Sequence, residues 1–250
     1  MKNVKDTLLD RRSVRRYEYD PVDDDTMAFI FDAIRNTPTS YNGQQYSVIN
    51  ITDSAVKEQL YQLTGQKQIK TCSHFLVFLA DYHKISLLAE AKGIEMSPFY
   101  DTVDGLTVGT VDAALAMMSA IVAAESCGVG TCPIGYARTA APEKISEILH
   151  LPPHVTIVCG LALGVPREKP DLKPKQSATL TIMPDRYADD DTLLPALSAY
   201  DAEIHAYNAT RSGGTTTDHD WCGHIIDYYR EAQGYTMLES LRHRGFDLKK

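Results

Sequence analysis

Apolar and polar positions follow two different periods along this chain, and each period predicts one kind of element. Apolar residues recur every three to four positions in residues 4–12 and 23–37, which predicts two helices. The stretch HFLVFLADY is a continuous apolar run, typical of a strand covered on both faces. YSVINIT and HVTIVCGLALGVP predict two further strands. Because helices and strands alternate loosely, the pattern predicts a layered α/β or α+β core.

The most apolar helix is predicted for residues 104–126, and Gly128 would end it as a left-handed C-terminal cap. Its centre, Val108–Ala124, is mostly alanine, methionine and valine, but it contains Asp112. We therefore expect a helix buried in a protein core, and no membrane span or membrane partner.

The chain after residue 183 is more polar than the part before it. Helical patches are predicted there at residues 193–207, 222–231 and 237–244. No internal repeat is present in the sequence. We expect residues 1–183 to form the core and residues 184–250 to form a C-terminal extension or cap of the same domain.

The distribution of charge limits the kinds of ligand that the chain is expected to bind. The chain has 250 residues and a formal net charge of −8, which argues against a general nucleic-acid binder. Against this background, RRSVRRY places four arginines within residues 11–16, so the cationic patch is local and indicates one small anion. MKNVKDTLLDRR lacks the apolar segment of a secretory signal, and the five cysteines form no CxxC pair. We therefore expect reduced thiols and a cytoplasmic protein.

Other sequence motifs of nucleotide binding, catalysis or metal binding are absent or weak. The dinucleotide fingerprint is absent, since the third glycine after Gly128 and Gly130 is misplaced, and neither a P-loop nor a GxSxG elbow occurs. His219, Cys222 and His224 lie close in sequence, as zinc ligands do, but an ordinary turn explains them better and we expect no metal. The residue Cys132 is either a nucleophile or, more simply, a small apolar side chain.

A second basic cluster follows the last predicted strand. Lys173 and Lys175 flank a proline in the loop PREKPDLKPK. The loop TPTSYNGQQ adds hydroxyl groups, and VGTCPIGY is expected to be a glycine-rich turn. Arginine offers a rigid fork for phosphate and lysine adds a point charge, so together these segments are typical of a site for a phosphate and a ring.

Taken in order, these motifs resemble the FMN-dependent nitroreductase family, and within it the long-tailed oxygen-insensitive NAD(P)H nitroreductases and flavin reductases. The likeness runs nearly end to end, and the pair RRSVR and PDLKPK with the tail segments AYNATR and DHDW carries most of it. The resemblance implies an α+β fold, in which helices wrap a mixed sheet, with a C-terminal helical extension. It also implies a domain-swapped homodimer, with the helix from Asp104 at the interface.

The resemblance implies a set of FMN-binding residues. They are Arg11, Arg12, Ser13, Arg15, Thr39, Ser40, Tyr41, Gln66, Pro133, Ile134, Gly135, Lys173 and Lys175. Arg11 matches the phosphate ligand, and Arg12 and Ser13 line the same edge of the flavin. Arg15 matches the residue near N1 and O2, where a fixed cation stabilises the negative charge of the reduced flavin.

The other positions complete the implied site. The loop with Thr39 and Ser40 would come from the partner subunit, and Gln66 would lie at the pyrimidine. Gly135 would direct its N–H at N5, with Pro133 and Ile134 at the ring edge. The Lys173 and Lys175 pair would hold the ribityl chain and phosphate; the second is commonly arginine in the family, so the fork is lost here.

The implied activity is electron transfer from NADPH or NADH to nitroaromatic, quinone or flavin acceptors by a ping-pong mechanism. No side chain need act as a nucleophile or obligatory base. Arg211 is the candidate for the nicotinamide cofactor, but SGGTTTDHD follows it without a further basic residue, so the preference for NADPH or NADH stays open. Two alternatives remain: a dedicated enone or dehalogenating reductase of the same fold, and a flavin-binding sensor or carrier with little turnover.

Overall fold

The computed structural model describes residues 1–212 and 217–248. Within these ranges the chain divides into two compact units, one of residues 1–169 and 236–248 and the other of residues 170–212 and 217–235. We call these the core unit and the tail unit. Helices and one sheet build the core unit, so the predicted α+β class is confirmed. The break between units falls after Lys169, and the division proposed after residue 183 stays a prediction.

The core unit contains a four-stranded sheet with the order β1-β2-β4-β3. Every neighbouring pair of these strands is antiparallel, and one parallel bridge joins Ser13 to Thr131. The strands are β1 (Tyr46–Ile51), β2 (His74–Asp81), β3 (Gly130–Ile134) and β4 (Val155–Gly164). Three of them lie where the apolar runs predict strands.

The strand β3 corrects the expected glycine-rich turn. Its residues pair with Gly160–Gly164 of β4, and Thr131, Cys132 and Ile134 are buried. The stretch is short and contains a proline and a glycine, which disfavour a strand in isolation. Pairing with a buried neighbour outweighs that local preference, so sequence pattern alone does not reveal this strand.

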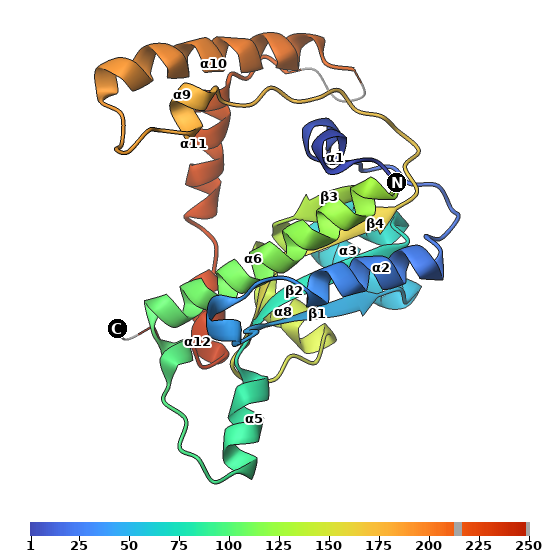
Figure 1. Ribbon diagram of the computed structural model, residues 1–250, viewed down its shortest axis with the longest axis vertical. Coiled ribbons are helices and arrows are strands. Elements are labelled where there is room, and N and C mark those ends of the chain that lie inside the picture. Colours follow the sequence, from blue (N-terminus) through green and yellow to red (C-terminus); the bar gives the residue numbers. More distant parts are fainter. Residues whose placement is uncertain (213–216, 249–250) are drawn as a thin grey trace. The chain divides into compact units, whose positions relative to one another are not determined.

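Helices cover both faces of the sheet, so β2 is buried on both faces. Its side chains alternate: Leu76, Phe78 and Ala80 join one apolar cluster, and their odd-numbered neighbours join the other. The first cluster is closed by α2 (Asp24–Arg35) and α6 (Val103–Ser126), which Figure 1 shows lying across the sheet. The second is closed by α3 (Ser54–Thr64), α4 (Lys67–Thr71), α7 (Tyr136–Thr139) and α8 (Pro142–Ile148).

Side-chain caps fix the ends of these helices. Asp23 accepts a hydrogen bond from the Thr26 N–H and Asp53 accepts from the N–H groups of Ala55 and Val56, as N-caps do. The remaining elements of the core unit are α1 (Val4–Asp10), η1 (Ser40–Asn42), α5 (His83–Ala91), η2 (Phe99–Asp101) and α12 (Met237–His243).

Helix α6 has the length and apolar composition of a membrane span, which core helices of soluble proteins also have; it is the one such helix in the described ranges. It packs on α2 and on the sheet. Asp112, near its middle, is fully buried and bonds to two backbone N–H groups of the core unit. These contacts are those of a helix in a protein core.

The tail unit contains α9 (Ala178–Thr181), α10 (Asp190–Thr210) and α11 (Trp221–Ala232). Asp189 caps the start of α10, which runs through Pro195. Polar contacts join the start of α11 to α10: the Asn208 amide donates to the His219 carbonyl at 2.7 Å, and the Cys222 N–H donates to Asp201 at 2.8 Å.

Candidate functional site

The arginine-rich segment lies beside β3, at the edge of the sheet. The Val14 N–H donates to the Thr131 carbonyl at 2.9 Å, and Ser13 bridges Thr131 in parallel. On its other side the segment meets the chain that leaves β4, where the Arg167 N–H donates to the Arg16 carbonyl at 3.0 Å. Backbone bonds on both sides therefore fix where each arginine side chain begins.

Two glycines allow this close approach. A Cβ on Gly130 would lie 2.9 Å from the Val14 side chain, and one on Gly164 would lie 2.7 Å from the Tyr17 ring. Val14 and Tyr17 are both buried, and the Tyr17 hydroxyl donates to the Val14 carbonyl at 2.7 Å. The segment is thus anchored by two of its own side chains, Val14 between the two arginine pairs and Tyr17 directly after the second pair.

Glu168, in the chain that leaves β4, binds the backbone of the arginine-rich segment, and sequence reasoning missed it. One carboxylate oxygen accepts from the backbone N–H groups of Arg15 and Arg16, at 2.7 and 3.1 Å. The other oxygen lies 3.7 Å from the Arg16 guanidinium. A single glutamate in a basic loop gives no sequence signal of this role, because the contact spans more than 150 residues.

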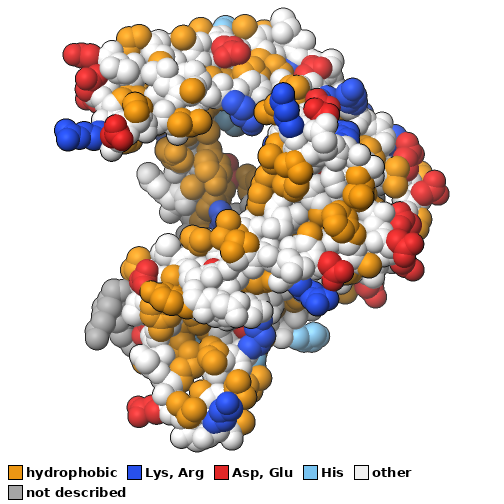
Figure 2. Space-filling model, in the orientation of Figure 1, with side chains coloured by type: hydrophobic (Ala, Val, Ile, Leu, Met, Phe, Trp, Pro, Cys, Tyr) orange, Lys and Arg blue, Asp and Glu red, His pale blue; other side chains and the backbone are white. Residues whose placement is uncertain are grey.

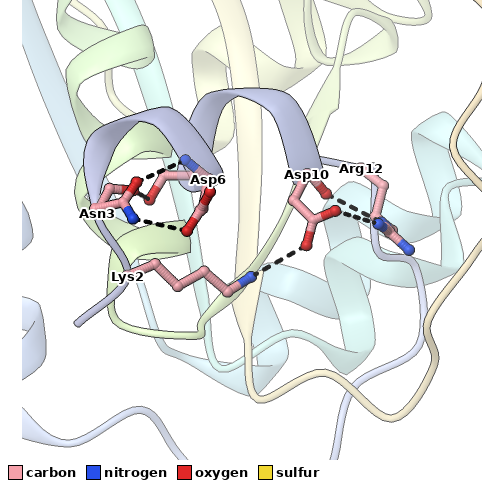
Figure 3. A network of polar contacts seen from close by, with 6 residues as sticks. Lys2, Asn3, Asp6, Asp10 and Arg12 are labelled. Atoms are coloured by element: carbon pink, nitrogen blue, oxygen red, sulfur yellow. Dashed lines mark hydrogen bonds and ion pairs between the residues drawn. The ribbon is translucent and has the colours of Figure 1, made fainter.

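The arginine side chains of this segment differ in the contacts they make. Figure 3 shows the Arg12 guanidinium, which donates to the carbonyl and carboxylate of Asp10, at 3.0 and 3.1 Å, in a network with Lys2. Arg15 donates to the Ser13 carbonyl at 3.3 Å but forms no ion pair with the described residues. Arg11 forms no side-chain hydrogen bond or ion pair within the same ranges. Among the four arginines of this segment, Arg11 and Arg15 are therefore the ones that form no ion pair with the described residues.

A buried carboxyl lies beneath this segment. The Thr131 hydroxyl donates to Glu125 at 2.7 Å. Burial raises the pKa of Glu125, while that hydrogen bond and the nearby charges of Arg11 and Lys2 lower it in part. Burial therefore favours the protonated form more than it would be favoured in an exposed glutamate.

The carboxyl end of β3 leaves an open position at Gly135. Pro133 is half-buried and Ile134 is buried, whereas Gly135 is exposed. Its φ of −66° and ψ of −31° suit any residue, and no atom lies within 4 Å of the place a Cβ would take. The glycine therefore leaves room for a group outside the chain to approach the backbone closely.

Cys132 has the properties of an apolar core residue. Its side chain is buried within the cluster on the α3 face of the sheet. Burial raises the pKa of the thiol, although nearby Arg15 lowers it in part. A protonated, enclosed thiol is a poor nucleophile, which supports the simpler of the two interpretations given to this cysteine.

The hydroxyl loop is held by the buried Asp112 carboxylate of α6. One oxygen accepts from the Ser40 N–H at 3.0 Å and the other accepts from the Gln45 N–H at 3.2 Å. Inside the loop, the Thr39 hydroxyl accepts from the Gln44 N–H at 3.2 Å. Tyr41, which has a φ of 53°, is fully exposed. Asp112 thus clamps both ends of a loop that presents its central side chain outward.

Gln66 lies at the N-cap of α4 and is half-buried. Its side-chain oxygen accepts from the Gln68 amide at 2.8 Å, and Gln68 is buried. This contact uses the Gln66 carbonyl oxygen and leaves its NH₂ group able to donate. Gln68, like Asp112, is a supporting residue that sequence reasoning missed.

The remaining candidates belong to the tail unit. Lys173 and Lys175 are exposed, and Arg211 is half-buried at the C-terminus of α10. Asp171 accepts from the N–H and hydroxyl of Ser212, at 2.6 and 2.8 Å, so the lysine loop and the end of α10 are joined. Residues 213–216 of the segment after Arg211 lie outside the described ranges.

No metal centre is formed by the described residues: in these ranges no three His, Cys, Asp or Glu side chains gather as ligands. The core unit instead fits a phosphorylated flavin. Arg11 and Arg15 offer guanidinium groups that make no ion pair with the described residues, and Gly135 leaves space for a ring edge. An amide donor at Gln66 suits a pyrimidine carbonyl.

Comparisons with known proteins show similarity to one family in both parts of the chain. The sequence model of the nitroreductase family matches residues 8–165, and that of its C-terminal domain matches residues 173–249. The chain is 32% identical over 251 residues to the FMN reductase [NAD(P)H] of Bacillus subtilis, covering 100% of both chains. It is 35% identical over 241 residues to the oxygen-insensitive NADPH nitroreductase of Salmonella typhimurium, covering 96% of both.

Among solved structures, the hypothetical oxidoreductase YcnD of Bacillus subtilis superposes with a TM-score of 0.94. It is 32% identical, and the match covers 100% of both chains. Similarity therefore extends over the core and tail units alike, and the family predicted from the motifs is confirmed.

Proposed function

This chain belongs to the nitroreductase family, and we propose that it is an FMN-dependent oxidoreductase. Its electrons come from NADPH or NADH and pass to nitroaromatic, quinone or flavin acceptors. Relatives named FMN reductase [NAD(P)H] and oxygen-insensitive NADPH nitroreductase support the reaction class. The observation that carries the proposal is the arginine segment, fixed by backbone bonds beside β3, the strand after which the open Gly135 position follows.

In this function the core unit binds and orients the cofactor. Arg11 binds the phosphate, with Arg12 and Ser13 along the same edge. Arg15 holds positive charge at the pyrimidine end, where Gln66 donates a hydrogen bond. When bound, FMN supplies hydride acceptance and donation at N5, which lets one site serve donor and acceptor in turn.

The supporting contacts prepare these groups before any ligand arrives. Glu168 fixes the backbone at Arg15, and Gln68 orients the amide of Gln66. A cation that is already in place when negative charge develops stabilises that charge without reorganisation. The remaining ring-edge and phosphate contacts are assigned to Pro133, Ile134, Gly135, Lys173 and Lys175.

The active form is a homodimer, in which Thr39, Ser40 and Tyr41 serve the partner's flavin. An apolar groove of about 800 Å³ runs between α1, α2 and α6 and includes Phe29, Leu115 and Met118. Those three side chains are more than a third exposed, and Figure 2 shows apolar side chains at the surface near α1 and along α6. Such a surface favours burial against another protein chain.

The tail unit is assigned to the nicotinamide cofactor through Arg211. A charge-assisted contact to a 2′-phosphate contributes about 1.5–3 kcal/mol, which is enough to set a tenfold preference for NADPH. The cytoplasm, where both donors are abundant and thiols stay reduced, is the location that suits this chemistry and the free cysteines.

The test is stopped-flow absorbance of the purified yellow protein, mixed with NADPH or NADH under argon. We expect rapid bleaching by at least one donor and recovery of the colour on adding a nitroaromatic or a quinone. The ratio of the two bleaching rates measures the donor preference. Bound FMN that neither donor bleaches would instead favour a flavin sensor or carrier, and a protein that takes up no FMN would contradict the assignment.

A further inference from the structure

The core unit contains a second cluster of cationic side chains, which shares Arg15 with the proposed flavin site. It lines a cleft of about 1040 Å³ between the arginine segment, α3, α4 and the start of β2. Six cationic side chains line it against one carboxylate, that of Glu18. The six are Arg15, Arg16, Lys57, Lys67, Lys70 and Arg167. In a chain with a net charge of −8, such a concentration marks an anion site.

Half of these cations already have partners. The buried Lys57 ammonium donates to the Cys72 carbonyl at 2.8 Å. Lys70 pairs with Glu58 at 2.6 Å, and Arg16 lies 3.7 Å from Glu168. These three side chains are therefore held by the protein.

The other half remain available. Arg15, Lys67 and Arg167 are exposed, and none forms an ion pair with the described residues. They come from three separate segments and converge on one cleft. Ser73 adds a hydroxyl to the same lining; it accepts from the Val22 N–H at 3.0 Å and can still donate. Two guanidinium forks, an ammonium group and a hydroxyl are the donor set that binds phosphate oxygens.

One end of the cleft adjoins the proposed flavin site. Arg15 lines the cleft, and so does Gln68, whose amide donates to Gln66. Arg11, assigned to the phosphate of the resident FMN, does not line it. A molecule in the cleft would thus lie next to the pyrimidine edge without competing for the resident phosphate.

We propose that this cleft binds the phosphate groups of a mobile nucleotide that exchanges electrons with the resident flavin. This inference rests on the proposed function. Two nucleotides carry the required chemistry: the pyridine dinucleotide donor, through its adenylate phosphates, and free FMN as an acceptor. Lys67 and Arg167 bind the phosphate, and Arg15 serves both the cleft and the flavin edge.

The test compares wild type with the double variant Lys67→Gln/Arg167→Gln. The matched control is Lys92→Gln/Lys144→Gln, which removes the same charge from exposed side chains outside the cleft. Each protein is assayed with NADPH and with the phosphate-free donor 1-benzyl-1,4-dihydronicotinamide, and with FMN and riboflavin as acceptors. Calorimetric binding of adenosine 2′,5′-bisphosphate and of free FMN in excess over the resident FMN provides a readout that does not require turnover.

We expect the cleft variant to raise the KM of one phosphate-bearing substrate by about tenfold, the loss of one or two charge-assisted contacts. The phosphate-free counterpart should stay within about twofold of wild type, and binding of the corresponding nucleotide should weaken in parallel. A change confined to NADPH and the bisphosphate places the donor in the cleft. A change confined to FMN over riboflavin places the acceptor there.

Three results would overturn the proposal. The first is equal behaviour of the cleft and control variants. The second is an equal loss with phosphate-free substrates. The third is weaker binding of the resident FMN itself, which would assign the cleft to that cofactor. Failure of the proposed function is seen separately, because wild-type protein would then not bleach, while the calorimetric arm would still decide whether the cleft binds nucleotide phosphate.

Discussion

Helices α2 and α11 each contain 12 residues and each begin at an aspartate cap, yet their side chains are buried to different extents. Helix α2 buries Met27, Ile30 and Ile34 against α6 and the sheet, whereas α11 buries no residue. The difference extends to the units that contain them. Three apolar clusters build the core unit, while the described part of the tail unit buries only Leu193, Ile204 and Asn208.

The basic segments of the two units also differ in how they are held. In the core unit, backbone bonds and Glu168 fix the segment that carries Arg11 and Arg15. In the tail unit, Lys173 and Lys175 lie on an exposed loop joined to the end of α10 by Asp171. The core unit thus fixes its cationic segment at several backbone positions, whereas the described contact of the lysine loop lies within the tail unit.

Hydrogen exchange tests this contrast most strongly. Because α11 buries no side chain and α2 buries three, α11 should open at a lower free energy. We expect its amides to exchange about a thousandfold faster than those of α2, a difference of about 4 kcal/mol. Native-state exchange followed by mass spectrometry or NMR measures both helices in one sample. Equal protection would mean that another surface, such as a partner subunit, stabilises α11.

The substitution Arg15→Ala tests the fixed cation. Removing a preorganised charge from the place where negative charge develops should slow flavin reduction about a hundredfold, with NADPH and NADH affected alike. Stopped-flow bleaching measures the rate, and FMN content is quantified alongside. Arg35→Ala, which removes an exposed arginine paired with Asp32, is the control. Full FMN occupancy with an unchanged reduction rate would exclude this role for Arg15.

The substitution Asp112→Asn tests the clamp on the hydroxyl loop. The amide keeps one acceptor oxygen, so either the Ser40 or the Gln45 N–H loses its partner. We expect the free energy of unfolding to fall by about 1–3 kcal/mol, measured by urea denaturation. Asp104→Asn, at an exposed position of the same helix, is the matched control. If both variants unfold alike, the two hydrogen bonds do not hold the loop.

The smallest effect is expected from Glu125→Gln. Because burial raises the pKa of Glu125, the folded state retains its proton to higher pH than the unfolded state does. Stability from this group is therefore greatest at low pH and is lost as pH rises from its ordinary value of 4.5 to the raised value. We expect the free energy of unfolding of the variant, relative to wild type, to increase across that window. Urea denaturation between pH 4 and pH 7 measures it; a constant difference would contradict the raised pKa.

The sequence predicted those parts of the fold that depend on local pattern. The apolar runs locate β1, β2 and β4, and the spacing of apolar residues locates α2 and α6, because burial against a neighbouring layer requires those periods. The strand β3 was missed, since its formation depends on pairing with β4 rather than on its own composition. The family followed from short motifs, while the FMN-site residues carried over from it stay predictions.

The sequence by itself determined a layered core of helices and strands, the local arginine patch and, through its short motifs, the family with its α+β fold, because each depends on patterns among neighbouring residues. Tertiary structure alone decided which groups support the site. Glu168 reaches Arg15 and Asp112 reaches Ser40 across 153 and 72 positions, and the cationic cleft gathers side chains from segments just as separate. Contacts of this kind join residues that are far apart in the sequence and form only in the tertiary structure, so no local pattern of residues predicts them.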